Sequence, residues 1–404
     1  MVEMKEDVVV IGETRTLDVP VIIKYMGSKK PILDFITSNI RGIHRDGNIV
    51  CDLFAGSCSI SAGLRNEFDF ISNDIQEYSR TIGQTYFSDF SGVNLEKLMI
   101  SILNTAQIHY SKLSESLNGY IFDYGNINTL EEFYRIEEKQ RDLFKMDIAT
   151  NDYNLFTKFY SGTYWSCEQC IWIDSLRKAA DDIINITYRN VILSSIMFAM
   201  ANTSQSTGHF AQYRDGHSHD SMLNIIIYRQ KGFLDSFKKK LTELLSVLRN
   251  PVKSIVTTTQ DFTECLSHLP ENITVYADPP YAPVHYSRFY HALETLIKYD
   301  YPKLEFKGRY RMDRHQSPFS QKTKAIQAFE DLFDGIISKR SQMLLTYSNG
   351  GVVEIGQLIT LARKKFGKEY IIDLQEFDHI HSTMGKADDA RRDVVEHLII
   401  AKLK

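Results

Sequence analysis

The chain has 404 residues, 43% of them hydrophobic and 24% charged, which is the composition of a globular protein long enough for two domains. Its formal net charge of -4 argues against indiscriminate binding of polyanions, although a local basic face can still bind nucleic acid. No apolar run reaches the roughly 20 residues of a membrane span, so we expect no membrane partner.

A strand-and-helix alternation begins near residue 21. Residues 21–40 hold a Gly-Ser turn flanked by lysines and then a helix expected to start near Pro31. The apolar run 48–54 predicts a buried strand that leads into a turn of small residues, 55–59. A helix and a second strand over 68–74, ending in an acid, follow. This order is typical of the opening of a doubly wound α/β domain.

The middle of the chain, residues 86–250, lacks this alternation. Long stretches such as 94–117 and 233–248 carry apolar residues at helical spacing. No repeat or low-complexity tract interrupts them. We therefore predict a mainly helical inserted domain between the two halves of an α/β domain.

The alternation returns at Val252. Strands are expected over 254–258, 273–277 and 342–348, and two apolar runs in the tail, 370–383 and 394–403, predict a closing antiparallel hairpin. The predicted fold class is therefore α/β, with a doubly wound, mostly parallel sheet and a C-terminal antiparallel hairpin. Its α/β domain is discontinuous and is made of residues 21–85 and 251–404.

The most informative residues are Asp278-Pro279-Pro280-Tyr281, directly after the predicted strand 273–277. The two prolines fix two backbone φ angles and remove two N–H donors. What remains is a carboxylate, exposed carbonyl oxygens and a flat ring. This set suits a planar group that bears an NH2, such as a nucleobase with an exocyclic amine.

A second candidate site surrounds the first predicted turn. In open α/β sheets, ligands bind beyond the carboxyl ends of the strands, where the turn 52–59 and Asp74 are expected. Small residues let the backbone approach a ligand, and an acid that closes the next strand can accept hydrogen bonds from two ribose hydroxyls. Cys58 stands where a second glycine of a dinucleotide motif is expected, which favours a nucleoside without a diphosphate, such as S-adenosylmethionine. A plain tight turn is the alternative.

The five cysteines lie far apart, at positions 51, 58, 167, 170 and 265. An odd number of cysteines without a signal peptide predicts reduced thiols and a cytoplasmic location. Cys167 and Cys170 form a lone C-x-x-C without a second pair of ligands, so we expect no metal site.

Taken together, the motifs resemble the D12 class of DNA adenine-N6 methyltransferases, which includes the Dam-type enzymes. The segments that carry the resemblance are Lys24-Tyr25-Met26-Gly27-Ser28-Lys29, Asp52-Leu53-Phe54-Ala55-Gly56-Ser57, Asn73-Asp74, Gln260-Asp261-Phe262 and Asp278-Pro279-Pro280-Tyr281. Their order, with a recognition region between two halves, is similar to the α arrangement of amino-methyltransferases. The likeness covers about 21–80 and 253–404, and Cys58 departs from the family's usual glycine.

The resemblance implies a Rossmann-like methyltransferase sheet that binds S-adenosylmethionine. Residues implied in cofactor binding are Lys24, Tyr25, Gly27, Lys29, Asp52, Phe54, Ala55, Gly56, Ser57, Asp74, Asp261 and Phe262. Lys24 and Lys29 suit the methionine carboxylate, with ordinary surface lysines as the alternative. Asp261 is expected to contact the cofactor's adenine, with a turn acid or helix cap as the alternative.

The resemblance also implies that the Asp278 motif is catalytic. Asp278 and the Pro279 carbonyl would accept the two amine hydrogens of an adenine, and Tyr281 would stack on the base. Simple core packing is the alternative for Tyr281. An adenine in double-stranded DNA must leave the stack to reach such a site.

Two stretches are candidates for DNA contact. Residues 303–324 contain seven Lys or Arg and two acids, just past the Asp278 motif, and suggest a phosphate clamp or a lid over the target base. Residues 204–214 are polar and aromatic and suggest base reading. The residues that we expect to contact DNA are Arg288, Lys307, Arg309, Arg311, Arg314, His209, Gln212 and Arg214. A solvated basic loop and an ordered structural loop are the alternatives.

The sequence thus predicts a site-specific DNA adenine methyltransferase that serves a restriction–modification or related defence system, with a cognate restriction endonuclease or other defence protein as a partner. Residues 86–250 would form the target recognition domain. Other amines remain open as substrates: cytosine N4, an adenine in RNA, or a glutamine side chain. A DNA-binding module that has lost its methylation activity is the alternative outside enzymes.

Overall fold

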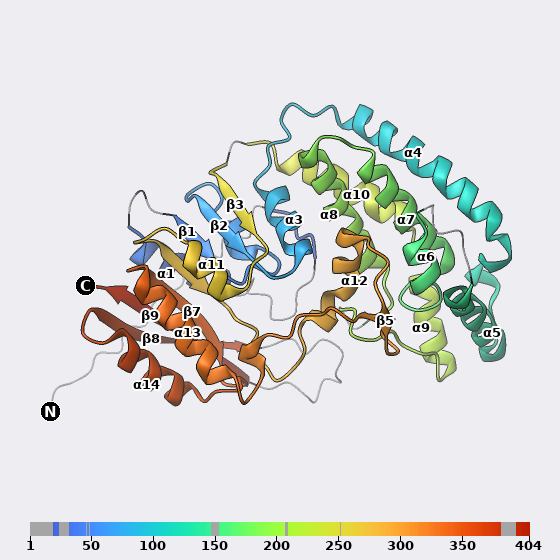
Figure 1. The fold of residues 1–404 in the computed structure, drawn as a ribbon. Coiled ribbons are helices and arrows are strands. Elements are labelled where there is room, and N and C mark those ends of the chain that lie inside the picture. The colour runs from blue at the N-terminus through green and yellow to red at the C-terminus, as the bar shows by residue number, and fades with distance from the viewer. Residues whose placement is uncertain are drawn as a thin grey trace.

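The protein consists of a twisted sheet covered by helices and a helical part beside it (Figure 1). The computed structural model describes residues 19–23, 32–45, 47, 49–146, 153–206, 209–250, 252–380 and 393–404. The sheet has seven strands in the order β3-β2-β1-β4-β7-β9-β8. Their bounds are β1 Val50–Asp52, β2 Phe70–Asn73, β3 Ile255–Thr258, β4 Thr274–Ala277, β7 Gln342–Ser348, β8 Tyr370–Ile380 and β9 Asp393–Leu403.

The predicted fold class is confirmed. Strands β1 to β4 and β7 pair in parallel, whereas β9 runs antiparallel to both β7 and β8 and closes the sheet as a hairpin. Val50 of β1 is in register with Phe70 of β2 and with Thr274 of β4. Because these strands start level and are three or four residues long, their carboxyl ends meet at one edge of the sheet.

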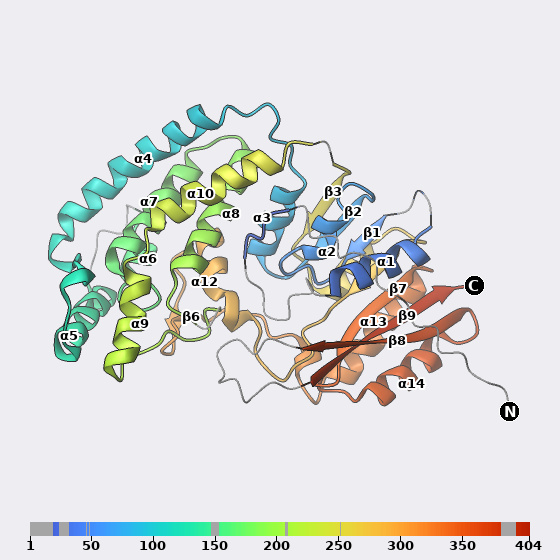
Figure 2. The same cartoon turned by 180° about the vertical axis from the view of Figure 1, so that it is seen from behind.

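Helices cover both faces of the sheet, as expected for a doubly wound fold. One face packs against α11 (Phe262–His268), α13 (Ala325–Ser338) and α14 (Ile355–Phe366) through side chains such as Val275 and Met343. The other face packs against α1 (Leu33–Ile43) and α2 (Ser59–Gly63) through Val50, Tyr276 and Leu344 (Figure 2). Alternate residues of one strand thus enter different cores, which is the period of two that a strand dictates.

The helical part grows from α3 (Glu77–Tyr86), which follows β2. Its other helices are α4 Leu95–Ser116, α5 Leu130–Arg141, α6 Leu155–Tyr160, α7 Cys167–Asp181, α8 Ile186–Thr203, α9 His219–Arg229 and α10 Phe233–Val247. Short 3-10 turns lie at Asn118–Tyr120, Tyr124–Asn126, Asp142–Lys145 and Pro318–Ser320. Residue Ser166 begins α7 with a reciprocal capping box to Gln169, which satisfies two orphan backbone donors.

One helix of the C-terminal half packs in the helical part. Helix α12 (Ser287–Lys298) buries Phe289, Leu293 and Leu296 in the same apolar core as α7 and α8. The small hairpin of β5 (Leu304–Glu305) and β6 (Tyr310–Arg311) follows it. The division into residues 21–85 with 251–404 and residues 86–250 stays a prediction about folding units, but in space the chain returns to the helical part after residue 286.

Among the described residues, no helix combines the length and the apolar character needed to cross a membrane.

Candidate active site

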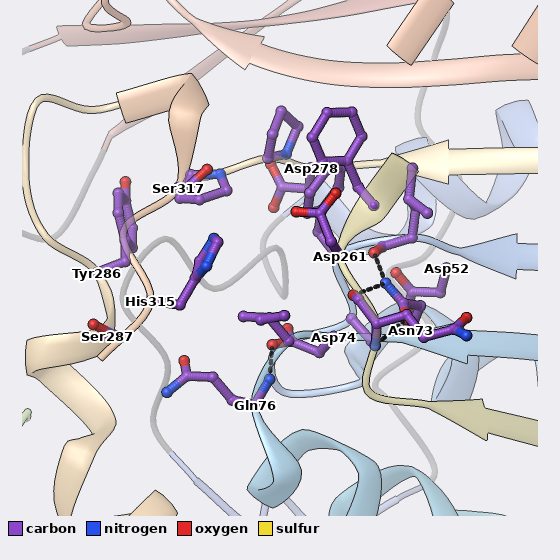
Figure 3. Close-up of a pocket in the computed structure, with 18 of the residues that line it drawn as sticks. Asp52, Asn73, Asp74, Gln76, Asp261, Asp278, Tyr286, Ser287, His315 and Ser317 are labelled. Atoms are coloured by element: carbon purple, nitrogen blue, oxygen red, sulfur yellow. Dashed lines mark hydrogen bonds between the residues drawn. The ribbon is translucent and has the colours of Figure 1, made fainter. Parts of the chain in front are cut away.

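A pocket lies at the edge of the sheet where the carboxyl ends of β1, β2 and β4 meet (Figure 3). It brings together the first turn, Asp74 and the whole Asp278 motif, which lie up to 229 positions apart in the sequence from Asp52 to Tyr281. Predicted site residues that line it are Asp52, Phe54, Ala55, Ser57, Asp74, Asp261, Phe262, Asp278, Pro279, Pro280 and Tyr281. Lys24, Tyr25, Gly27 and Lys29 lie outside the described residues.

The first turn is shaped for close backbone approach. Gly56 has a φ of +50° and Cys58, which caps α2, has a φ of +56°. The Gly56 N–H donates to Asp74 Oδ2 at 2.8 Å, so Gly56 braces the site from behind the lining. The Cys58 thiol is buried and donates to the Ser79 carbonyl at 3.4 Å. The cysteine that departs from the family's glycine therefore faces α3, where Gly83 leaves room for it.

Asn73 joins three chain segments below the pocket. Its amide group donates to the carbonyls of Leu53 and Gln260, each at 3.1 Å, and its carbonyl oxygen accepts from Thr258 Oγ1 at 2.8 Å. The Asn73 backbone carbonyl also accepts from the Ala55 N–H at 2.9 Å. This buried side chain at the end of β2 therefore connects the residue after β1 with the end of β3 and the residues that follow it.

Four acidic residues line this pocket, Asp52, Asp74, Asp261 and Asp278, and the first two and Asp278 influence one another's charge. Burial and the nearby charges of Asp278 and Asp74 raise the pKa of Asp52 to about 8. Burial raises the pKa of Asp74 to about 6, against the hydrogen bonds from the Gln76 and Gly56 N–H groups, which lower it. Asp52 Oδ2 has no hydrogen-bond partner among the residues that the structure describes. A cationic ligand fits such a cluster because it relieves the repulsion.

The Asp278 motif is held from β7 and β9. Thr346 Oγ1 on β7 donates to Asp278 Oδ1 at 2.8 Å, and the Tyr276 hydroxyl lies 3.1 Å from the same Thr346 oxygen. The Tyr281 hydroxyl donates to Glu396 Oε1 on β9 at 3.1 Å. The acid and the aromatic ring of the motif therefore each have an anchor on the sheet.

The side of the pocket nearest α11 is aromatic. Phe262 packs on Phe319 with ring centroids 4.9 Å apart, and Phe54 meets Phe319 edge-on at 5.5 Å. Asp261 caps α11: its Oδ1 accepts from the Thr263 N–H at 3.0 Å and from Thr263 Oγ1 at 2.7 Å. Asp261 is thus a helix cap, the alternative reading of the sequence, and also lines the pocket.

Sequence reasoning did not single out the opposite wall. Tyr286, Ser287, His315 and Ser317 face the carboxylates from across the pocket, and Gln76 lies beside Asp74 (Figure 3). Burial lowers the pKa of His315 and so favours its neutral form. His315 and Ser317 lie in the stretch 303–324, which the sequence suggested as a lid over the target base, whereas Gln76, Tyr286 and Ser287 lie in neither of the two stretches chosen for DNA contact.

Residues 25–345 match the sequence model of the D12 class N6 adenine-specific DNA methyltransferases. The chain belongs to this family. Among curated proteins it is 24% identical over 367 residues to modification methylase LlaI of Lactococcus lactis subsp. lactis, which covers 87% of this chain and 50% of that protein.

Two further relatives in the family are type II methyltransferases. M.FokI of Planomicrobium okeanokoites is 22% identical over 82% of this chain and 45% of its own length. M.NlaIII of Neisseria lactamica is 21% identical over 87% of this chain and 90% of its own length. The chain spans about half the length of LlaI and M.FokI, whereas it spans most of M.NlaIII.

In the basic stretch 303–324, the residues that we chose for phosphate contact interact with other residues of the protein. Arg311 is 2% exposed, and its guanidinium binds Asp300 at 2.6 and 2.8 Å and Asp313 at 2.8 and 3.0 Å. Because both sides of the guanidinium fork are occupied by acids, the structure places Arg311 in an ion-pair cluster rather than on a DNA-facing surface.

Three other basic candidates have partners within the fold. Arg309 donates to the Phe159 carbonyl at 2.6 Å and is half-buried. Lys307 forms an ion pair with Asp215. Arg314 donates to the Arg311 carbonyl at 2.8 Å and lies over the Tyr310 ring. An excess of basic residues in a sequence does not show which of their side chains already form ion pairs or hydrogen bonds within the protein.

The remaining candidates lie near α12 and in the stretch 204–214. Arg288 is half-buried, with its guanidinium carbon 5.0 Å from the centre of the Phe289 ring, and the His209 ring lies 4.6 Å from that same ring. Gln212 and Arg214 are exposed.

Within the described part of the chain, no three His, Cys, Asp or Glu side chains are placed to hold a metal ion.

Proposed function

We propose that this chain is a site-specific DNA methyltransferase that transfers a methyl group from S-adenosylmethionine to the N6 amine of an adenine in double-stranded DNA. The observation that carries the proposal is the pocket in which the Asp278 motif faces the first turn and Asp74. Membership of the D12 class, with modification methylases among the relatives, supports adenine in DNA over the other amines.

The pocket fits S-adenosylmethionine by its chemistry. The cofactor carries an ammonium and a sulfonium, and Asp52 offers a buried carboxylate oxygen that lacks a partner. Asp74 after β2 would accept hydrogen bonds from the ribose hydroxyls, and Phe262 and Asp261 would contact the cofactor's adenine. When bound, the cofactor supplies an electrophilic methyl group.

The residues of the Asp278 motif would orient the adenine amine, which is a poor nucleophile, for the reaction. The adenine amine shares its lone pair with the ring, so it becomes nucleophilic when the nitrogen is pyramidal and the lone pair is localised toward the methyl group. Asp278 and the Pro279 carbonyl would accept the two amine hydrogens and favour this geometry. Tyr281, tethered by Glu396, would stack on the base and set its angle. Most of the rate enhancement would then come from orientation and electrostatics. The methylated amine would then lose a proton to Asp278 or to water.

The base must be flipped out of the duplex to reach this pocket. Tyr286 and His315, which line the opposite wall, would shield the flipped base from water. Residues 21–85 and 251–404 would carry catalysis and residues 86–250 most of the target recognition. We place the enzyme in the cytoplasm of a bacterium or archaeon, beside a restriction endonuclease or another defence protein.

The test is transfer of a labelled methyl group from S-adenosylmethionine to duplex DNA, single-stranded RNA and a protein extract. We expect label in duplex DNA, at adenine N6. Asp278→Ala should lower the turnover number at least about 100-fold, because an acceptor for the developing charge is lost. Its affinity for S-adenosylmethionine should stay near wild type, as calorimetry would show.

Arg135→Ala serves as the control, because Arg135 is exposed on α5 and far in sequence from every motif. Label in RNA or protein but not in DNA would replace adenine in DNA with another amine. Full activity in Asp278→Ala would contradict the role of Asp278, and DNA binding without any transfer would indicate a module that has lost catalysis.

A further inference from the structure

Residues 210–216 form a surface segment of the helical part in which buried and exposed side chains alternate. It connects α8 to α9 without regular secondary structure. Phe210, Ala211, Tyr213 and Gly216 are buried, whereas Gln212 and Arg214 between them are exposed. An alternating pattern of this kind is what an extended chain produces when one side lies against a surface.

The start of the 210–216 segment is bonded to α12 and the hairpin that follows it. The Phe210 N–H donates to the Phe289 carbonyl at 2.8 Å, and His291 Nε2 lies 2.9 Å from the Phe210 carbonyl oxygen. The Tyr310 hydroxyl donates to the Ala211 carbonyl. The segment from the insertion and the stretch after the Asp278 motif are therefore one structural unit.

The end of the segment is held by a charge clamp on Asp215. Arg141 approaches Asp215 Oδ1 at 3.7 Å, and Lys307 pairs with Oδ2. The same two cations lie over the Tyr213 ring, at 5.1 and 5.2 Å from its centroid. Because Arg141 comes from α5 and Lys307 from the hairpin, Asp215 ties together three separate stretches of the chain.

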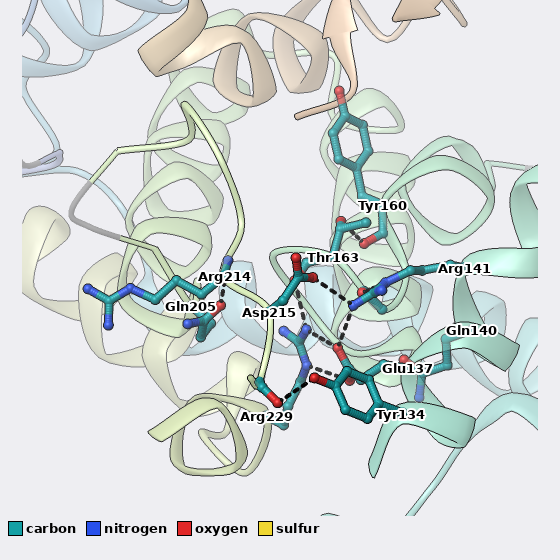
Figure 4. Close-up of polar contacts among 12 residues, drawn as sticks. Tyr134, Glu137, Gln140, Arg141, Tyr160, Thr163, Gln205, Arg214, Asp215 and Arg229 are labelled. Atoms are coloured by element: carbon teal, nitrogen blue, oxygen red, sulfur yellow. Dashed lines mark hydrogen bonds and ion pairs between the residues drawn. The ribbon is translucent and has the colours of Figure 1, made fainter. Parts of the chain in front are cut away.

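A buried ion pair supports the clamp. Glu137 and Arg229 have side chains 2% and 0% exposed and are 2.7 Å apart, and Arg141 lies 3.8 Å from the same Glu137 oxygen (Figure 4). Arg141 also donates to the Gly162 carbonyl at 2.6 Å. Glu137 and the Gly162 carbonyl therefore hold Arg141 in position for its ion pair with Asp215.

The segment's last backbone oxygen is anchored as well, since the Tyr134 hydroxyl donates to the Gly216 carbonyl at 2.7 Å. The Arg214 side chain points away from this network (Figure 4). Neither Gln212 nor Arg214 makes a side-chain hydrogen bond or ion pair within the described part of the chain. Their backbones are ordered by the fold, so a hydrogen bond to a ligand would cost only side-chain entropy.

The spacing of the two exposed side chains matches DNA. Side chains two residues apart on an extended chain project to the same side, about 7 Å apart. Successive bases of one strand rise about 3.4 Å, so this distance corresponds to two base steps. Glutamine pairs through two hydrogen bonds with adenine N6 and N7, and arginine with guanine O6 and N7.

We propose that Gln212 and Arg214 determine the target sequence, by reading an adenine and a guanine two steps apart in the major groove. Asp215 is the positioning residue that sets their register. This inference rests on the proposed DNA methyltransferase activity and names the part of the target that it recognises.

The experiment is methylation of a pool of duplexes with randomised sequence around an adenine, followed by sequencing of the methylated molecules. Wild type should select one target. Gln212→Ala should lose selection at one position of that target and Arg214→Ala at another, about two base pairs away. Each should methylate the wild-type target about 10- to 100-fold less efficiently in kcat/KM.

Asp215→Asn keeps the size of the side chain and removes its charge. It should relax selection at both positions together, with an unchanged slope of binding against salt concentration on nonspecific DNA, which a phosphate-contacting residue would alter. Asp215→Glu should restore most of the selection. Arg135→Ala and Gln107→Ala, exposed substitutions on α5 and α4, should keep the full wild-type target.

The outcomes separate this inference from the proposed function. If wild type selects a target and both Gln212→Ala and Arg214→Ala retain it fully, while their thermal melting matches wild type, the inference is wrong and the proposed function stands. If wild type methylates no duplex in the pool, both fall together.

Discussion

At the scale of single residues, the pocket depends on carboxylates that would repel one another without a ligand. Burial is the largest cause of the raised pKa of Asp52, and the charges of Asp278 and Asp74 add to it. Proteins concentrate such shifts at functional sites. Asp52 Oδ2 has no hydrogen-bond partner among the described residues, and we therefore expect this oxygen to face the cationic part of the cofactor.

This arrangement predicts pH-dependent binding of S-adenosylmethionine. A cationic cofactor favours ionised Asp52, so binding releases the proton that Asp52 holds below a pH of about 8. The ionised fraction of Asp52 rises about tenfold between pH 7 and pH 9, but the cofactor's own ammonium loses its proton in the same range. The quantity to follow is therefore the ratio of the Asp52→Asn dissociation constant to the wild-type one, which should rise with pH. Isothermal titration calorimetry across this range measures the change.

Asp52→Asn is the control for this prediction, because asparagine has the same size and does not titrate. Its binding should be weaker and should change with pH only as the cofactor's ammonium titrates. A ratio of the two dissociation constants that stays the same between pH 7 and pH 9 would show that Asp52 does not meet the charged part of the cofactor.

At the scale of elements, the β5–β6 hairpin is stabilised by charges that the sequence suggested for DNA. Arg311 has a side chain 3% exposed, and it serves two acids, Asp300 and Asp313. The ion pairs lower the pKa values of both acids below their usual range. A guanidinium in this position fixes the hairpin next to α12.

Arg311→Met should therefore destabilise the protein by about 1–3 kcal/mol, because two acids lose their partner and only part of that loss is recovered by their hydration. Denaturant unfolding measures this change. The salt dependence of nonspecific DNA binding should be unchanged. A shallower salt slope with wild-type stability would restore Arg311 to the DNA interface.

At the scale of the whole molecule, the two halves of the chain share one apolar core. Helix α12 follows the Asp278 motif, yet its buried stripe packs with α7 and α8 of the insertion. Helix α3, which follows the first strands, contributes Tyr78 and Ile82 to this same core. The sheet and the helical part are thus joined on both sides of the pocket.

Leu293→Ala, at a fully buried position of α12, tests this coupling. It should cost about 2–5 kcal/mol and lower the stability of both parts in a single transition. The only two tryptophans, Trp165 and Trp172, lie in the helical part, so their fluorescence reports on it alone, while circular dichroism reports on all elements. Two separate transitions would contradict the shared core.

Much of the candidate site could be predicted because its residues follow strands directly. A short apolar run that ends in Asp74 or Asp278 needs only the rule that parallel strands end at one edge. Tyr286, His315, Thr346 and Glu396 could not be found in this way. They come from other turns and strands, and only packing brings them to the pocket.

The sequence by itself determined the class of fold and the chemistry at the strand ends, because periodicity and local motifs act over a few residues. The tertiary structure alone decided which charges are available. Arg311 and Lys307 look like free cations in the sequence, but Arg311 pairs with Asp300 and Asp313, which are near it in the sequence, and Lys307 pairs with Asp215, 92 positions away. The same packing left Gln212 and Arg214 exposed on a fixed backbone. Contacts between residues about a hundred positions apart leave no pattern in the local sequence. In this protein they help to decide which polar side chains stay exposed and which are paired within the fold.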